Sequence, residues 1–145
     1  MIQLQRTISV RKPVDVVVDY LRNFSRTEQW DPGTLSCVRV DDGPIQVGAR
    51  WRNISRFKGK ETELIYELVR LEPERLLFIG KNKTATSTDD LTVASAHDGS
   101  VIIYQATIVF HGIAKLADPF LKREFEKLGD AVVDTMAEVV NAIPV

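Results

Sequence analysis

Six strand-like segments follow one another through the middle of the chain, separated only by short turns. They span residues 35–41, 48–58, 61–71, 75–83, 86–96 and 101–111. The dipeptides Asp98-Gly99 and Lys58-Gly59 are good hairpin signals between neighbouring segments. Connections this short can join antiparallel strands, whereas parallel strands need long crossovers. The sequence therefore predicts an antiparallel meander.

A further strand and two short helices are expected before this meander. Residues 2–10 alternate apolar and polar side chains like a half-buried strand. Residues 13–24 have helical spacing, and residues 25–31 fit a second short helix that ends at Pro32-Gly33. Arg6 lies on the apolar face of the first strand. We expect it near a sheet edge or paired with an acid, and a role as counter-ion for a ligand carboxylate is the alternative.

The chain closes with one long amphipathic helix. Apolar residues step by three or four from Leu121 to Ile143, which places them in a single stripe. Asp118 is the expected N-cap and Pro119 the expected first helical residue. There is no linker or repeat, so we expect a single domain over residues 1–145.

Composition excludes several classes of protein. A net charge of −1 with both signs scattered gives no bulk field for nucleic acid. Cys37 is the single cysteine, so no intramolecular disulfide is expected, and we interpret it as a small buried residue. The longest apolar runs are far shorter than the ~20 residues of a membrane span. With no secretory signal at the start, a cytoplasmic location is expected.

The strands on either side of Lys58-Gly59 indicate which sheet face is buried. On one face, basic residues of 48–58 lie beside acidic residues of 61–71, as on a solvated sheet face. The other face carries the residues that we expect to point inward: Trp51, Asn53, Ser55, Phe57, Thr62, Leu64, Tyr66 and Leu68.

This inward set mixes aromatic rings with an amide and hydroxyls, which is typical of a small-molecule pocket. Later strands continue the pattern with Phe78, Tyr104 and Ile108. The alternative is an ordinary core in which each polar group bonds a neighbour.

Gly129 interrupts the apolar stripe of the terminal helix, where glycine costs ~1 kcal/mol relative to alanine. It could allow close backbone approach, relieve crowding by a Phe or Trp, or leave room for a ligand. The sequence does not separate these three roles.

The segment "EQWDPGT", residues 28–34, places Trp30 beside an acid at the end of the second short helix. Asp31 is interpreted as a turn-forming residue before Pro32. Trp30 either plugs the core or lines a pocket mouth, and we favour the plug.

Five motifs in order resemble the START-like polyketide cyclase/dehydrase and lipid-transport superfamily, also called SRPBCC. They are "RKPVDVVVDYLRNF", "WDPG", "DDGPIQVGARW", "LEPERLLFIG" and "HDGS". The resemblance runs over about 140 residues. It implies an α+β helix-grip fold, in which a curved seven-stranded antiparallel sheet wraps around a long C-terminal helix, with two short helices between strands 1 and 2.

The resemblance also implies a cavity between the sheet and the terminal helix. We predict that it binds or carries an apolar small molecule such as a lipid, polyketide or aromatic compound, without a cofactor. The expected lining residues are Trp30, Trp51, Asn53, Phe57, Leu64, Tyr66, Phe78, Tyr104, Ile108, Phe125, Gly129 and Val132. The oligomeric state is left open.

No catalytic set is evident, so we lean against an enzyme. His97 and His111 lie outside any metal-ligand spacing, and the nucleophile and nucleotide motifs are missing. Asp89-Asp90 is interpreted as a solvated strand start or bulge. If the protein is an enzyme of the aromatase/cyclase type, Asn53, Tyr66 and Tyr104 are expected to orient the substrate.

The third alternative is a protein-interaction module of the co-chaperone or ribosome- and quinone-associated type. A cavity filled by side chains, together with an exposed apolar patch, would favour it.

Overall fold

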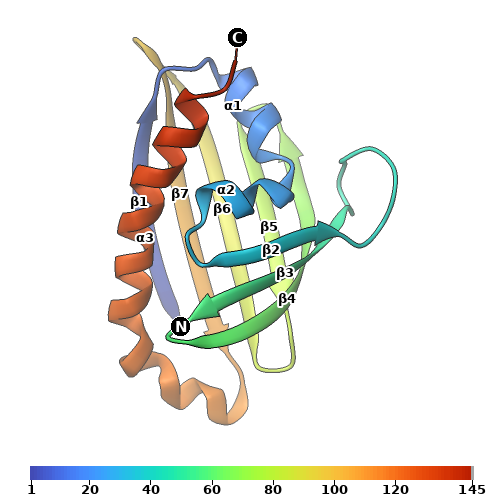
Figure 1. Cartoon of the computed structure of the whole chain (residues 1–145), viewed down its shortest axis with the longest axis vertical. Helices are drawn as coiled ribbons and strands as arrows, with labels where there is room; N and C mark the ends of the chain where they lie inside the picture. The colour runs from blue at the N-terminus through green and yellow to red at the C-terminus, as the bar shows by residue number, and fades with distance from the viewer. Residues whose placement is uncertain (145) are drawn as a thin grey trace.

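The computed structural model describes residues 1–144 and contains one seven-stranded antiparallel sheet (Figure 1). The strands are ordered β1-β7-β6-β5-β4-β3-β2, so β1 joins the far end of the meander. Their bounds are β1 Ile2–Val10, β2 Thr34–Arg39, β3 Arg50–Phe57, β4 Lys60–Glu72, β5 Arg75–Lys81, β6 Ala85–Ala96 and β7 Gly99–Phe110. The six predicted meander strands are confirmed within a few residues.

The helices lie against one side of this sheet (Figure 1). The long helix α3 runs beside β1, and α1 and α2 cover the end of the sheet near the C-terminus of the chain. The bounds are α1 Val14–Leu21, the 3-10 turn η1 Phe24–Arg26, α2 Thr27–Trp30, the 3-10 turn η2 Gly112–Ala117 and α3 Asp118–Asn141. The predicted fold, a curved sheet around a long C-terminal helix, is confirmed.

The start of α3 differs from the prediction. The helix begins at Asp118, its N-cap position is Ala117, and no side chain caps it. Asp118 instead pairs with the N-terminal amine of Met1. The preceding turn η2 leads directly into α3, so Asp118 adopts helical backbone angles and cannot serve as the N-cap.

The acidic pair of β6 is also placed differently. Asp89-Asp90 lies in the middle of β6, not at a strand start or bulge, because β6 begins at Ala85. The alternation of the strand turns Asp89 inward and Asp90 outward, where Asp90 pairs with Arg75 at 2.8 Å. A solvated position is therefore correct for Asp90 and wrong for Asp89.

The outer face of the sheet carries the expected ion pairs. Arg52 pairs with Glu63, and Arg56 with Glu61 at 3.3 Å, across the β3–β4 hairpin. At the edge, Arg6 of β1 pairs with Asp130 of α3 at 2.8 Å. Arg6 thus has the acidic partner predicted for it.

One end of the space between sheet and helices is filled by aromatic side chains. Phe24 lies with its ring centroid 4.3 Å from that of Phe78, 6.1 Å from Trp51 and 6.3 Å from Trp30. All four are at most 1% exposed. We call these four residues the aromatic core. Two of its rings come from the short helical segments, Phe24 from η1 and Trp30 from α2.

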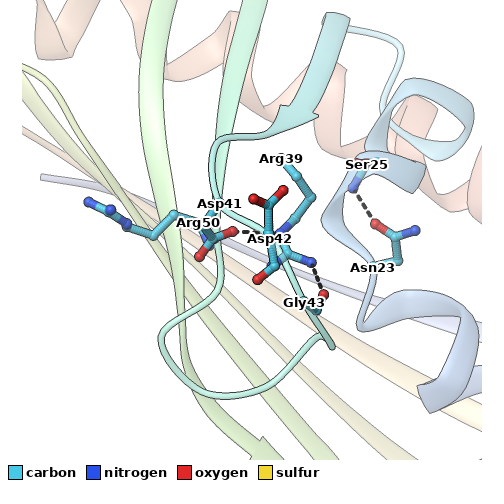
Figure 2. A network of polar contacts seen from close by, with 7 residues as sticks. All are labelled: Asn23, Ser25, Arg39, Asp41, Asp42, Gly43 and Arg50. Carbon is cyan, nitrogen blue, oxygen red and sulfur yellow. Dashed lines mark hydrogen bonds and ion pairs between the residues drawn. The ribbon is translucent and has the colours of Figure 1, made fainter.

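Polar contacts fix the connection between β2 and β3 (Figure 2). Arg39 donates to Asp41 at 2.7 Å, and Asp41 in turn accepts from the backbone N–H of Arg50. This arrangement holds the Arg39 guanidinium 5.4 Å from the Trp51 ring. The hydrogen bond from Arg39 also holds the pKa of Asp41 below its usual value.

Candidate functional site

The other end of the same space is hollow. A cavity of about 440 Å³ lies between the sheet and α3. Apolar side chains form most of its wall, with a few polar groups among them. This size and chemistry match small-molecule sites, which usually measure about 300–1,000 Å³.

Sheet register explains where the hollow begins. Tyr66, Gly80, Ser87 and Ile108 face one another across β4, β5, β6 and β7, and three of these four line the cavity. The register brings small residues, glycine and serine, to the centre of this row. Small side chains on a concave sheet leave room beneath the helix, which larger ones would fill.

The next two rows of cross-strand partners carry larger side chains and leave less open space. Leu68, Phe78, Asp89 and Ala106 form the row that follows. Beyond them, Leu91 and Leu76 are 0% exposed. Asp89 therefore stands at the boundary between the hollow and the solid part of the interior.

Tyr66 crosses the floor of the cavity because its neighbour is a glycine. A Cβ atom on Gly80 would lie 2.7 Å from the Tyr66 ring, closer than such atoms approach. The ring lies over Gly80, and its hydroxyl donates to Ser87 Oγ at 3.1 Å. Gly80 thus positions the Tyr66 hydroxyl at the polar end of the cavity.

Two stacked rings flank the cavity at the β3–β4 hairpin. Phe57 of β3 and Phe125 of α3 lie 4.4 Å apart at 16° between their planes. Both line the cavity. Nearby, the turn η2 exposes Ile113 and Leu116 by 86% and 73%, and the first turn of α3 exposes Phe120 by 74%.

Gly129 of α3 lines the cavity and accommodates a residue of β1. A Cβ atom there would meet the two Leu4 methyl carbons at 3.1 and 3.2 Å. Of the three roles left open by the sequence, relief of crowding fits this contact, and the crowding side chain is an aliphatic Leu in place of the Phe or Trp considered.

Asp89 is the least expected residue of the wall. It is 7% exposed, and within residues 1–144 the one hydrogen bond to its carboxylate comes from the Tyr104 hydroxyl at 3.4 Å. Burial, reinforced by the charge of Asp31, raises the Asp89 pKa to about 7. Burial also raises the pKa values of Tyr66 and Tyr104 well above their usual value. Asp89 is therefore poised to exchange a proton near neutral pH.

Asp31 forms the turn predicted for it and also has a place in the cavity wall that was not predicted. Its Oδ1 accepts from the Gly33 N–H at 2.9 Å and its Oδ2 from the Thr34 hydroxyl at 3.0 Å, which confirms the turn. It also lines the cavity. Burial raises the Asp31 pKa, and the two hydrogen bonds oppose that increase.

Eight of the twelve predicted lining residues reach the cavity. They are Phe57, Leu64, Tyr66, Tyr104, Ile108, Phe125, Gly129 and Val132. The alternation of the inner face and the apolar stripe of α3 were sufficient to find them.

The other four predicted residues do not line the cavity. Trp30, Trp51 and Phe78 belong to the aromatic core, so Trp30 is the plug. Asn53 is buried, donates to Thr34 Oγ1 at 3.4 Å and accepts from the Ser55 hydroxyl at 2.6 Å. These four lie deeper than the cavity, because residues that share an orientation on one sheet face do not share a depth.

Sequence reasoning missed Asp31, Ser87 and Asp89 as wall residues. A signal for Asp89 was present, since it shares the period-two register of Leu91 and Val93. Cys37 is buried as predicted, and burial raises the pKa of its thiol.

Comparison with known families decides the relationship. The family model described as polyketide cyclase / dehydrase and lipid transport matches residues 1–141. The protein belongs to this family. Among curated proteins, no sequence match was found.

Solved structures share the fold at low identity. A START superfamily protein from Mycobacterium smegmatis superposes with a TM-score of 0.78 at 10% identity, covering 95% of this chain and 96% of that one. The Zhui aromatase/cyclase from Streptomyces sp. R1128 gives 0.79 at 12% identity, covering 95% and 92%. The di-domain ARO/CYC BexL gives 0.71 at 16% identity, and the match covers 98% of this chain but 50% of that one. At these identities the likeness establishes the fold alone.

A search of the helices within residues 1–144 finds none that is long and apolar enough to cross a membrane.

Proposed function

We propose that the protein binds an apolar small molecule in the cavity between its sheet and α3. The observation that carries this proposal is the cavity itself, about 440 Å³ in volume with a predominantly apolar wall. A void this large, if it served no purpose, would cost stability through lost packing contacts. The lipid or polyketide nature of the ligand, its carriage, and a cytoplasmic location belong to the same proposal.

The polar groups are distributed as a small ligand requires. Tyr66, Ser87, Tyr104 and Asp89 gather at the inner end, next to the aromatic core. A molecule that enters by its polar end would hydrogen-bond there and leave its apolar part against Phe57 and the α3 side chains. A few placed polar groups in an apolar pocket fix orientation in this way.

Filling the cavity tests the proposal. Ala106 lies on the inner face of β7 and lines the cavity, so Ala106→Phe should occupy part of its volume. We expect displacement titrations with an environment-sensitive apolar dye to give at least tenfold weaker binding, with an unchanged circular dichroism spectrum. Ala94→Phe, on the exposed part of β6, is the matched control. Equal dye binding by both variants and the unaltered protein would contradict the proposal, as would no bound molecule in native mass spectrometry and no binding across an apolar ligand panel.

A second candidate function, proton transfer on a bound ketone, is favoured by Asp89. A carboxylate with a pKa of about 7 is suited to act as a general base at neutral pH. It would remove a proton from the carbon beside the carbonyl, while the Ser87 hydroxyl donates to the oxygen that becomes the enolate. The proton would return to carbon or to water.

Deuterium exchange at the acidic carbon of a bicyclic ketone, tetralone, tests this second candidate. We expect the protein to accelerate exchange followed by nuclear magnetic resonance, and Asp89→Asn to abolish the acceleration. Asp90→Asn is the control, since Asp90 lies on the opposite face of β6. Exchange no faster than in buffer, or unaffected by Asp89→Asn, would rule this function out.

The protein-interaction alternative meets one of its two conditions. Ile113, Leu116 and Phe120 form an exposed apolar group, but side chains do not fill the cavity. Ligand binding therefore accounts for more of the structure.

A further inference from the structure

The inner end of the cavity carries two carboxylates without a cationic partner. Within residues 1–144 there are ten ion pairs, nine through Lys, Arg or His side chains and one through the N-terminal amine of Met1, and none of them includes Asp31 or Asp89. Asp31 uses its two oxygens within its turn. The Asp89 carboxylate is less well hydrogen-bonded, since its single contact of 3.4 Å, from the Tyr104 hydroxyl, is longer than an ordinary O–H···O bond.

Such a carboxylate lacks the compensation that buried charges normally have. A buried charge is usually paired or it becomes neutral, because the apolar interior does not solvate it. Asp89 faces the cavity, so a bound molecule can supply what the protein does not. The two negative charges would attract a cation and repel a ligand carboxylate at this end.

The cationic side chains of the cavity lie elsewhere. Arg56, Lys58 and Lys60 belong to the β3–β4 hairpin, where all three are exposed and Arg56 pairs with Glu61. The aromatic rings of Tyr66 and Tyr104 lie at the acidic end, and ring faces attract cations. The wall thus favours a positive group inside.

We propose that the ligand is an apolar amine whose protonated nitrogen pairs with Asp89 and whose hydrocarbon part fills the rest of the cavity. This inference rests on the proposed function and specifies the class of molecule that the same cavity takes. An alcohol of the same shape would hydrogen-bond there but leave the carboxylate unpaired.

The proton equilibrium of Asp89 adds an independent readout. The titratable groups that face it are Asp31, from the turn after α2, Tyr104 of β7 and Tyr66 of β4. The α3 residues that line the cavity are all apolar or glycine. Since the Asp89 pKa is about 7, its ionised form is scarce at pH 5 and predominant at pH 8. An alkylamine is protonated at both values, so its affinity should rise by about tenfold or more between them.

Three probes that share one ring system separate the ligand classes. Isothermal titration calorimetry would compare naphthylmethylamine, naphthylmethanol and naphthoic acid at pH 8. We expect the amine to bind at least about tenfold more tightly than the alcohol, and the acid most weakly. Asp89→Asn should reduce the affinity for the amine to that for the alcohol. Asp90→Asn removes the same charge from the opposite face of β6 and should leave the preference unchanged.

The outcomes are distinguishable. Binding of the alcohol as tight as that of the amine overturns the amine assignment and leaves the proposed function standing. If none of the three probes nor the apolar dye binds, both fall. Should Asp89→Asn not fold, the pH dependence of amine binding to the unaltered protein decides, and an affinity equal at pH 5 and pH 8 overturns the assignment.

Discussion

The two ends of the interior are built from the same sheet and yet differ in packing. At one end the aromatic core is closed, and its four rings are at most 1% exposed. At the other, the same strands surround a cavity of about 440 Å³. The short helices make the difference, because η1 and α2 insert Phe24 and Trp30 at one end only. Close packing is thus concentrated where the chain has extra elements, and the part of the interior beyond them is left hollow.

Removing a ring from each end should give the largest contrast. Phe24→Ala takes away a side chain that contacts the rings of Phe78, Tyr66 and Trp51, and we expect a loss of about 3–5 kcal/mol. Phe125→Ala removes a half-buried ring beside the cavity and should cost about 1–2 kcal/mol, since fewer contacts are lost. Urea denaturation measures both. Equal losses would contradict the division into a packed and a hollow end.

The boundary residue Asp89 should make stability depend on pH. Its pKa is raised from 3.8 to about 7, so the folded protein holds this proton more tightly than the unfolded chain does. The associated stability is complete below pH 4 and is lost as pH rises through 7. Asp89→Asn lacks this pH-dependent loss. Between pH 4 and pH 8 its free energy of unfolding should therefore rise relative to that of the unaltered protein, by at most about 4 kcal/mol.

Paired denaturation curves of Asp89→Asn and the unaltered protein across that pH range measure the difference. Asp90→Asn, which removes the partner of Arg75, should show no such gain. A constant difference between Asp89→Asn and the unaltered protein would show that folding does not raise the Asp89 pKa.

Gly80 should link the two ends through Tyr66. Gly80→Ala introduces a Cβ atom 2.7 Å from the Tyr66 ring, which must then move off β5 and into the cavity or the aromatic core. We expect a loss of about 1–3 kcal/mol, as for other overpacked sites, and weaker dye binding. Tyr66→Leu in the same background should recover part of the stability by relieving the contact. No recovery would mean that the strain lies elsewhere.

The smallest effect is expected at Gly129. Alanine is favoured over glycine in a helix by about 1 kcal/mol, but here its methyl group would lie 3.1 Å from Leu4. The two effects oppose each other, so Gly129→Ala should change the unfolding free energy by less than about 1 kcal/mol. Ligand affinity should fall because the methyl group intrudes on the wall. Combined with Leu4→Val, which shortens the opposing side chain, Gly129→Ala should be more favourable than it is alone if the contact with Leu4 offsets the helix propensity.

The sequence by itself determined the architecture. Period-two alternation, hairpin dipeptides and the apolar stripe of α3 are local signals, and each reports an element or the direction of a side chain. They sufficed to predict the seven strands, the three helices and eight residues of the cavity wall.

Depth along the interior was decided only in the tertiary structure. Trp51 and Phe57 point to the same side of β3, but one meets Phe24 and Phe78 while the other meets Phe125 and empty space. Asp89 likewise has an ordinary place in an alternating strand. Its raised pKa arises because elements distant in the sequence exclude water around it. Alternation fixes which face a residue occupies. Which of those positions are filled depends on contacts between segments that no local pattern records.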